Sequence, residues 1–585
     1  MSAFVDISIT NKTKPLKRVR IFNKPWVASD GYAYSLPHQI SKSATGQTFK
    51  ALESDELTIL VLGQFNTLVS DAELIYLLES SVLKIKPFKD PPGQWLILCF
   101  EKKTHNWHVF TDRFGTEKAY HRSGDHAAIS TYFGSILDDF DIKNFDQTGF
   151  TCFVGNGFFP EDLTYHSDVK VLKPASHYIF NESLALQEIS RYWNWEHSPD
   201  QSLSMDKALA EFHHLIINVV GQAVQNKRVA LPLSGGLDSR TLAGVLTHKD
   251  FKQRFPKSGA ITSFSYEYAN GLPEAQISSK IAATLNLPFK KFIVPNYLFN
   301  KMAVVEDSVE MFQTIDGTRQ IMVGDWLAEN SDVVLGGHWG DVWLDASNEI
   351  SETDLLPTYQ KKMNKRGREI LFDLLHNFIV DDPQNALDDY FTKAIEAYQH
   401  IKDSDFRMKA FKTDQWSFRW TLASIKAYQA GAYPVLPFYD GRMADFFEKI
   451  PTAWLVNRKF QVEYLKKFHP DLARITWQEY GANLFLYPYV NNRQLWYRVI
   501  SKLRRMLTFK KFTYRNWEVF YLNTEGRRSL EKDVYKHQWL VEKIGKERLD
   551  AFFAAFYANP KADNGYAMCH LHTFSRFINK YCPEG

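Results

Sequence analysis

The sequence predicts an α/β fold, with a β-rich first third, a middle region of alternating strands and helices, and a helical end. Three observations lead to this prediction. Short apolar runs typical of buried strands recur before about residue 195. From Val229 onward such runs alternate with helical patterns, as in parallel βαβ units. After about residue 480 the chain is rich in aromatic residues at helical spacing.

Length and composition are those of a large globular protein. The chain has 585 residues, of which 45% are hydrophobic and 23% are charged, so two or three domains with substantial cores are expected. The net charge of +3 is too small to indicate nucleic acid or a membrane surface as a partner, and we expect neither. The 4 cysteines lack metal-binding spacing, and no run approaches about 18 apolar residues. We therefore expect a cytoplasmic protein with reduced thiols.

The first predicted domain spans residues 1–196. Apolar runs typical of strands lie at 57–63, 94–100, 107–111 and 169–174, and a helix is predicted over 71–83. A polar stretch at 197–204 is interpreted as a linker.

The second predicted domain spans residues 205–480, and the third, 481–585, is a helical, aromatic-rich extension. An amphipathic helix is predicted over 205–226. The strands and helices that follow are predicted at 229–233, 261–266, 274–286, 292–294 and 333–335, and residues 350–480 are mostly helical. This alternation favours a parallel sheet with helices on both faces.

The most informative segment is Leu231–Arg240, which reads LPLSGGLDSR and joins a strand-like run to a helical pattern. Gly235 and Gly236 leave room for backbone N–H groups to converge on one point. The helix start adds unpaired N–H groups and the positive end of its dipole, so the loop suits a pyrophosphate. Asp238 would repel phosphate unless a cation lay between them, and we therefore predict that it binds Mg²⁺.

This loop differs from the common phosphate-binding loop, G-x-x-x-x-G-K-[ST], because it contains no lysine. It resembles the pyrophosphate loop of the ATP-pyrophosphatase enzymes, which split ATP between the α- and β-phosphates. The alternative interpretation is a glycine turn with a surface aspartate in an α/β domain.

Over about residues 55–480 the chain resembles the class B asparagine synthetase family. Besides the loop, the segments that carry the resemblance are Asp112–Gly115 with Tyr120, Leu172–Pro174, Tyr192–Trp193, Thr262–Ser265, Leu335–Asp341, Pro437–Asp440 and Lys459 with Glu463–Leu465. The resemblance implies an N-terminal Ntn-hydrolase-like α+β sandwich followed by an ATP-pyrophosphatase domain with a parallel sheet. It also implies ATP and Mg²⁺ as cofactors.

The glutaminase half of that family uses a cysteine directly after the initiator methionine. This chain begins Met1-Ser2-Ala3-Phe4, and its first cysteine is Cys99. A serine hydroxyl is far less acidic than a thiol and is the weaker nucleophile. We therefore expect the domain at 1–196 to be an inactive scaffold, with ammonia or an amine as nitrogen donor. Ordinary glutamine-dependent asparagine synthesis is the alternative.

The resemblance implies that a small-molecule or peptide carboxylate attacks the α-phosphate of ATP and that ammonia or an amine then displaces AMP. Asp238 and Asp341 are the expected Mg²⁺ ligands, and Lys459 the expected cation near the α-phosphate. The alternatives are a surface lysine at 459 and a turn or helix-capping aspartate at 341. The residues expected to bind ATP and pyrophosphate are Leu233, Ser234, Gly235, Gly236, Asp238, Ser239, Ser265 and Gly337.

Departures from the family concentrate around the acceptor pocket, so the acceptor is left open. His338 stands where family members have Glu or Tyr, and its imidazole could take a proton from the amine or bond a loop carbonyl. Tyr433 begins the segment that replaces the family's Glu-x-Arg-x and is a further candidate catalytic residue. Four residues at helical spacing are assigned to core packing, with substrate contact as the alternative: Asp414, Trp416, Arg419 and Trp420.

The leading hypothesis is an ATP-dependent, AMP-forming amide ligase. A catalytically inactive nucleotide-binding scaffold that recruits a partner is the alternative from another class, and a homodimer is an assembly that the sequence leaves open. His570 and His572 lie beside Cys569 without a second ligand pair, so no metal site is expected there.

Overall fold

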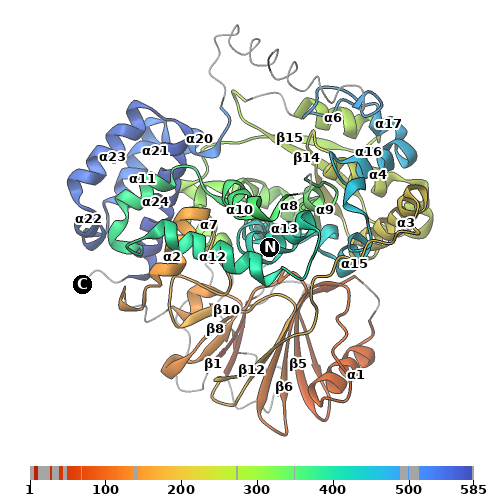
Figure 1. The fold of residues 1–585 in the computed structure, drawn as a ribbon, viewed down its shortest axis with the longest axis horizontal. Coiled ribbons are helices and arrows are strands. Elements are labelled where there is room, and N and C mark those ends of the chain that lie inside the picture. The colour runs from red at the N-terminus through yellow and green to blue at the C-terminus, as the bar shows by residue number, and fades with distance from the viewer. Residues whose placement is uncertain are drawn as a thin grey trace.

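Two antiparallel sheets form the N-terminal part of the molecule, at the bottom of Figure 1. The computed structural model describes residues 6–10, 27–28, 39–43, 49–66, 69–137, 142–271, 275–347, 350–487, 499 and 513–582. One sheet has the order β10 (Val169–Val171), β8 (Tyr120–Arg122), β9 (Ala128–Ser130), β1 (Asp6–Thr10), β3 (Gln39–Ser43), β2 (Val27–Ala28). The other has the order β12 (Leu186–Arg191), β11 (Ser176–Phe180), β7 (Asn106–Thr111), β6 (Gly93–Glu101), β5 (Leu57–Phe65), β4 (Phe49–Glu53).

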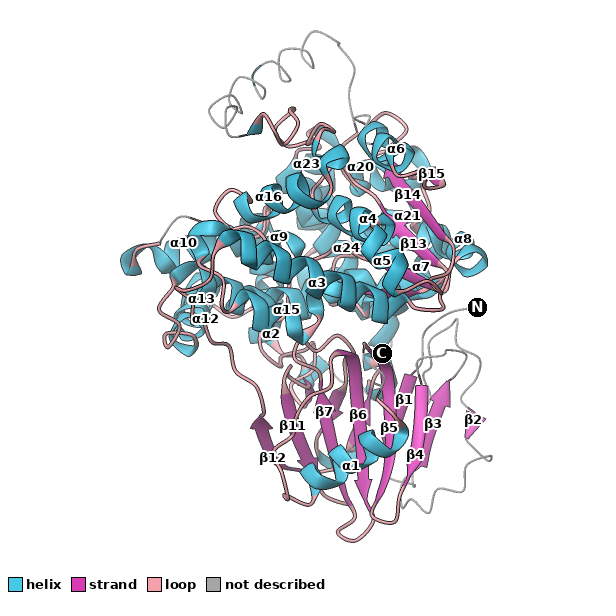
Figure 2. Ribbon diagram, turned by 90° about the vertical axis from the view of Figure 1, so that its right-hand side faces the viewer, coloured by secondary structure: helices cyan, strands magenta, loops and turns pink. Residues whose placement is uncertain are grey.

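Alternation of side chains along β5 explains why these sheets pack as layers. Leu60 and Leu62 share one apolar cluster with Ile7 and Ile9 of the facing sheet. Residues 57, 59 and 61 point the other way and pack under helix α1 (Asp71–Val82), which Figure 2 shows lying across this face. Ser70 is the N-cap of α1 and forms a capping box with Glu73.

A parallel sheet lies above the sandwich and carries the site. Its order is β15 (Phe289–Ile293), β14 (Ile261–Glu267), β13 (Val229–Pro232), β16 (Val333–Leu335), β17 (Tyr433–Val435). Its helices include α3 (Met205–Val224), α4 (Asp238–Thr247), α5 (Lys249–Arg254), α6 (Ala275–Thr284), α8 (Gly324–Asn330) and α9 (Gly340–Trp343). The chain adds strands to opposite sides of β13, which makes the edge between β13 and β16 a switch point where α/β proteins bind ligands.

Helices surround this sheet. In chain order they include α2 (Gln147–Asn156), α7 (Met302–Val309), α10 (Leu355–Met363), α11 (Arg368–Leu374), α12 (Pro383–Ala397), α13 (Ser404–Phe411), the π-helix η9 (Lys412–Thr421), α14 (Leu422–Lys426), α15 (Gly441–Phe447), α16 (Lys459–Phe468) and α17 (Pro470–Ala473). The C-terminal helices are α20 (Asn516–Tyr521), α21 (Thr524–Val534), α22 (Gln538–Ile544), α23 (Lys546–Ala558) and α24 (Ala562–Tyr581).

The predicted α/β class, with its antiparallel N-terminal strands, parallel sheet and helical C-terminus, is confirmed. The domain boundaries at 196 and 480 stay a prediction, and one apolar cluster crosses both. Phe150 of α2 lies 4.4 Å from Phe574 of α24, and Tyr165 lies 3.9 Å from Phe577, measured between ring centroids. Ser2 lies outside the described residues. Among the described helices, none combines the length and apolar character needed to cross a bilayer.

Candidate active site

The loop after β13 is held by hydrogen bonds among its own residues. The backbone N–H of Ser234 donates to Oγ of Ser239 at 3.1 Å, and the two hydroxyl oxygens lie 3.0 Å apart. The N–H of Gly236 donates to Oγ of Ser234 at 3.2 Å. Helix α4 begins at Asp238, so the loop brings its N-terminal N–H groups to the carboxyl edge of the sheet. This is the anion-binding arrangement that the sequence predicts.

A buried arginine fixes the other side of this loop. Arg240 is fully buried, and its guanidinium donates to the carbonyls of Gly235, Ile475 and Thr476. Burial without a carboxylate partner lowers its pKa to about 10. The segment 475–478 therefore packs directly on the loop: a Cβ at Gly235 would lie 2.2 Å from Oε1 of Gln478.

Asp238 is oriented by two partners that the sequence did not indicate. Its Oδ1 accepts from Nη1 of Arg458 at 2.7 Å and from Nε2 of Gln461 at 3.0 Å. Burial raises the pKa of the Asp238 carboxyl, Arg458 opposes that rise, and the nearby Asp341 adds to it. Arg458 adopts a left-handed conformation with φ 60°, which is strained for a residue with a side chain.

The second loop, between β16 and α9, touches the first one. A Cβ at Gly337 would lie 3.1 Å from the backbone N of Ser239, and a Cβ at Gly340 would lie 2.8 Å from Cγ of Asp238. Glycine at these positions permits this close approach. The contact places Asp341, the next residue, beside the start of α4.

These two loops line a cavity of about 420 Å³ at the carboxyl edge of the parallel sheet. It contains most of the residues predicted to bind nucleotide or metal, namely Leu233, Ser234, Gly235, Asp238, Ser239, Ser265, Gly337 and Asp341, together with His338. Gly236 belongs to the loop but is not part of the lining. The volume lies in the range of small-molecule sites, roughly 300–1,000 Å³.

His338 is a half-buried, uncharged group in the lining of this cavity. Burial lowers its pKa to about 4, with Asp341 opposing and Arg319 adding to the effect. Its Nδ1 is buried without a hydrogen-bond partner in the described part of the chain. No loop carbonyl among the described residues forms a hydrogen bond with the ring. The imidazole is therefore neutral at pH 7 and able to accept a proton.

Two further predicted residues lie outside the cavity lining. Lys459 is exposed at the first turn of α16, and in the described part of the chain its ammonium has no ion pair. Tyr433 is buried on β17, where its hydroxyl donates to Oε1 of Glu117 at 2.8 Å. This position corrects the expectation for Tyr433: it links the sheet to the N-terminal sandwich and does not reach the cavity.

The sequence analysis did not identify one cationic residue of the lining, and it favoured core packing for two tryptophans that line the cavity. Arg319 lines the cavity, with its guanidinium 5.1 Å from the ring centroid of Tyr266. Trp416 and Trp420 line it as well, and η9 carries both. Helical spacing alone assigns them to the core; π-helical turns, which are frequent at functional sites, depend on packing that the sequence does not reveal.

The donor set fits Mg²⁺. Mg²⁺ is usually held by one or two carboxylates together with substrate phosphates. Asp238 and Asp341 supply two carboxylates, and their mutual repulsion is part of what raises the pKa of Asp238. A divalent cation between them and a triphosphate would relieve that repulsion.

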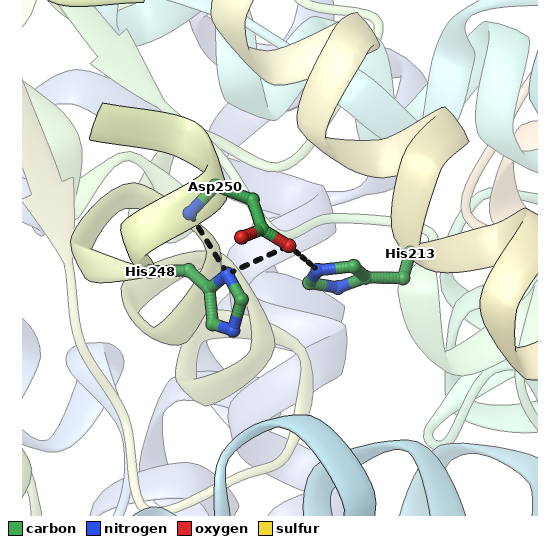
Figure 3. A group of neighbouring side chains, drawn as sticks. All are labelled: His213, His248 and Asp250. Atoms are coloured by element: carbon green, nitrogen blue, oxygen red, sulfur yellow. Dashed lines mark hydrogen bonds and ion pairs between the residues drawn. The ribbon is translucent and has the colours of Figure 1, made fainter. Parts of the chain in front are cut away.

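Figure 3 shows another group of titratable side chains, outside this cavity. Nε2 of His213 lies 3.2 Å from Oδ2 of Asp250, and Nδ1 of His248 lies 3.6 Å from the same oxygen. The three possible ligand atoms lie within 4.8 Å of one another. Nδ1 of His248, however, accepts the N–H of Asp250 at 3.3 Å as the N-cap of α5. Hydrogen bonding at this helix start accounts for the arrangement.

Comparison with known proteins gives one family. Residues 212–472 match the family model described as asparagine synthase. Comparison with curated proteins gives no match. Among solved structures, the chain is similar to the U34-tRNA thiolase NcsA from Methanococcus maripaludis, at 14% identity over 55% of this chain and 90% of that chain, with a TM-score of 0.23. It is also similar to glutamine phosphoribosylpyrophosphate amidotransferase from B. subtilis, at 10% identity over 44% and 77%, with a TM-score of 0.18.

Proposed function

Since residues 212–472 of this chain form an asparagine synthase domain, we propose that the protein is an ATP-dependent, AMP-forming ligase that converts a carboxylate into an amide. The observation that supports this most directly is the cavity at the switch point of the parallel sheet. There the Ser234–Ser239 loop, the start of α4 and the carboxylates of Asp238 and Asp341 converge.

The proposed reaction has two steps. A carboxylate oxygen of the acceptor attacks the α-phosphorus of ATP, and the bond from that phosphorus to the bridging oxygen of pyrophosphate breaks. An acyl-adenylate and pyrophosphate result. Ammonia or an amine then attacks the acyl carbon, the bond to the AMP oxygen breaks, and one proton leaves the nitrogen. Positioning and charge stabilisation supply most of the acceleration in such reactions.

Different residues of the chain are proposed to bind the pyrophosphate, to hold Mg²⁺ and to position the Mg²⁺ ligand. N–H groups of the loop and of α4 receive the pyrophosphate, and Ser234 and Ser239 add hydroxyl donors. Asp238 and Asp341 would hold Mg²⁺, which supplies charge neutralisation on the phosphates when bound. Arg458 and Gln461 position Asp238.

Two further groups complete the proposed site. Arg319 brings positive charge to the lining, and Lys459, directly after Arg458, has a free side chain at the same end of α16. Both are proposed to stabilise charge at the α-phosphate. His338 is proposed to take the proton from the attacking amine, since its ring is neutral and its Nδ1 is unpartnered.

The nitrogen donor is proposed to be ammonia or an amine. Cys99 is buried on β6 and Cys152 on α2, and burial raises the pKa of the Cys152 thiol to about 12. A thiol with so high a pKa is a poor nucleophile at neutral pH. Neither residue can therefore replace the N-terminal cysteine of a glutaminase.

The decisive experiment measures AMP and pyrophosphate release from ATP and Mg²⁺ with a panel of carboxylates plus ammonia. We expect at least one carboxylate to stimulate AMP release and Asp238→Ala to abolish it with the fold retained by circular dichroism. The control is Asp471→Ala, which removes an exposed aspartate paired only with Arg474 in the described chain. Turnover unchanged in Asp238→Ala would reject the proposal, and ATP binding without turnover for any acid would favour a nucleotide-binding scaffold.

A further inference from the structure

A second cavity, of about 470 Å³, lies against the first and has Trp416 and Trp420 in common with it. Four distant parts of the chain build most of its wall. They are the end of α2 with Asn156 and Phe158, the segments 313–317 and 362–366, and the C-terminal residues Tyr514, Arg515, Asn516, Trp517, Tyr566 and His570. The C-terminal helices thus close a chamber next to the nucleotide cavity.

The chamber is cationic. Its described lining includes Lys362, Lys365, Arg366 and Arg515 against the carboxylate of Asp316. None of these four cations forms an ion pair with a carboxylate elsewhere in the described chain. His570 adds no charge, because burial lowers its pKa to about 4. Cations gathered around one cavity repel each other, so an anionic occupant would be stabilised there.

The chamber also has aromatic walls. The ring centroids of Trp416 and Trp420 lie 5.7 Å apart with a tilt of 34°. Nζ of Lys365 lies 4.9 Å from the Trp420 ring, and the guanidinium of Arg515 lies 5.4 Å from the Tyr566 ring. Flat apolar surfaces with charged groups at their faces suit a ring that carries polar substituents.

Several buried polar atoms of the lining residues have no hydrogen-bond partner in the described chain. They are Nδ2 and Oδ1 of Asn156, Oε1 of Gln313, Oδ1 of Asn364, Nε1 of Trp517 and Nε2 of His570. A buried polar group without a partner is destabilising, because it has given up its hydrogen bonds to water. A polar occupant, to which these side chains can turn, would recover part of that cost.

We propose that this chamber binds the distal part of the acceptor, and that the acceptor is a ring-bearing acid with a second anionic group. The inference rests on the proposed function. The carboxylate to be activated must lie in the nucleotide cavity. The cations of the chamber would therefore bind a second anionic group of the same acceptor. Lys365 and Arg515, on opposite parts of the chain, are the specificity-determining residues. The second anion is a carboxylate or a phosphate.

Equilibrium binding tests the chamber without requiring turnover. Isothermal titration calorimetry on the full chain compares matched probes, benzoate with terephthalate and glucuronate with glucuronate 1-phosphate. In at least one pair, we expect the probe with the second anionic group to bind at least tenfold more tightly than its partner, and the preferred pair identifies carboxylate or phosphate. Lys365→Met/Arg515→Met should remove this preference. Arg366→Met, at an exposed position, should reduce it if the double variant does not fold.

Lys361→Met is the matched control, because Lys361 is exposed on the same helix as Lys362 and is not part of the lining. Equal binding within both pairs, absence of binding, or a preference that survives in the variants would overturn the proposal. AMP release from the same acids separates the two proposals. Release without any preference for the probes with a second anionic group retains the ligase and rejects the chamber, whereas preferential binding without release from any of these acids rejects the acceptor role of the chamber.

Discussion

Single glycines decide how closely the two loops of the candidate site approach each other. Gly235 faces Gln478, Gly337 faces the backbone N of Ser239, and Gly340 faces Asp238, and an added Cβ would lie 2.2, 3.1 and 2.8 Å from these neighbours, closer than ordinary van der Waals contact. The carboxylate of Asp238 is therefore enclosed by backbone on one side and by Arg458 on the other. This enclosure leaves the carboxylate a defined orientation before any ligand arrives, which is the preorganisation that charge stabilisation requires.

Lys459 gives the first prediction at this scale. We expect Lys459→Met to slow ATP–pyrophosphate exchange about 10²–10³-fold, the cost typical of removing one group that stabilises transition-state charge. Lys467→Met serves as the control, since Lys467 lies at the far end of the same helix in an exposed pair with Asp206. Equal rates in the two variants would assign the charge stabilisation to Arg319 alone.

The second prediction at the residue scale concerns His338. We expect His338→Gln to leave ATP–pyrophosphate exchange within about threefold and to slow amide formation about 10²-fold, because proton acceptance by a side chain contributes roughly 10²–10⁴. Both rates are measured on the same preparation with ammonia as the donor. Loss of exchange and amide formation in parallel would instead make His338 a positioning residue of the nucleotide cavity.

The sequence predicts well those site residues that are adjacent in the chain. Segments 233–239 and 337–341 each follow a strand, and parallel strands bring their carboxyl ends to one edge. Arg319 reaches the same cavity from a short 3-10 helix (Arg319–Val323) and Trp416 from a π-helix, and the placement of both elements depends on tertiary packing. Arg458 reaches Asp238 only because its backbone is left-handed, a conformation that no local pattern of this segment indicates.

At the scale of elements, α3, α5 and α16 meet around buried histidines. His213 of α3 stacks on Phe468 at 4.0 Å between ring centroids, and its Nδ1 lies 3.1 Å from the hydroxyl of Tyr464. Burial lowers the pKa of His213 to about 4 and that of His469 to about 3, and nearby histidines add to both shifts. Asp250 opposes the shift at His213. The folded protein therefore keeps these rings neutral.

This cluster predicts acid sensitivity. The pKa of His213 is lower in the folded state than the ordinary value of about 6.5, so its contribution to stability is present above pH 6.5 and is lost as pH falls toward 4. The loss is at most about 1.4 kcal/mol per pH unit for each such group. We expect the midpoint of thermal unfolding to fall over this range and to fall less in His213→Phe. His214→Phe, at the exposed neighbouring position, should retain the wild-type slope.

Strands were easier to predict than the helical elements that shape the cavities. The strand-like runs before residue 195 and after Val229 match β5, β6, β7, β13, β14 and β16 to within a few residues, because buried strands are continuous apolar runs. Amphipathic spacing found α3. The same kind of spacing predicts an ordinary α-helix over 412–421. The structure has a π-helix there, η9, and both of its tryptophans line the two cavities.

At the scale of the whole molecule, α7 connects the two ends of the chain. Glu306 pairs with Arg576 of α24 at 2.5 Å and Asp307 pairs with Lys580 at 2.5 Å. The hydroxyl of Tyr132, from the N-terminal sandwich, donates to Asp307 at 2.8 Å. The C-terminal helices thus belong to the structural core that supports the site.

Breaking this connection should destabilise the whole chain. Arg576→Met removes one ionic partner from the carboxylate of Glu306 and one from that of Asp533. Because Glu306 is only 4% exposed, we expect the free energy of unfolding to fall by about 3–5 kcal/mol. The midpoint of thermal unfolding measures it. Arg527→Met removes an exposed pair with Glu531 and should cost at most about 0.5 kcal/mol. After Arg576→Met, Glu306 keeps Lys580 as a partner in the described chain, at 3.6 Å, and adding Glu306→Gln should restore part of the loss if the weakened pairing of this charge is its cause.

The order of elements along the chain was predictable, but their long-range assembly was not. Alternating strands and helices indicate a parallel sheet from local pattern alone. The aromatic residues after 480 gave no indication of what they cover, since contacts such as Phe150 with Phe574 join residues more than four hundred positions apart. Aromatic composition indicates that burial occurs and leaves the buried partner unspecified.

The two indoles common to both cavities have a thermodynamic consequence. A ligand that orders Trp416 and Trp420 from one side changes the free energy with which the other side binds its own ligand. Linkage makes this effect reciprocal, so the factor by which nucleotide alters the dissociation constant of the acceptor equals the factor by which the acceptor alters that of the nucleotide. Measuring either factor therefore gives the other.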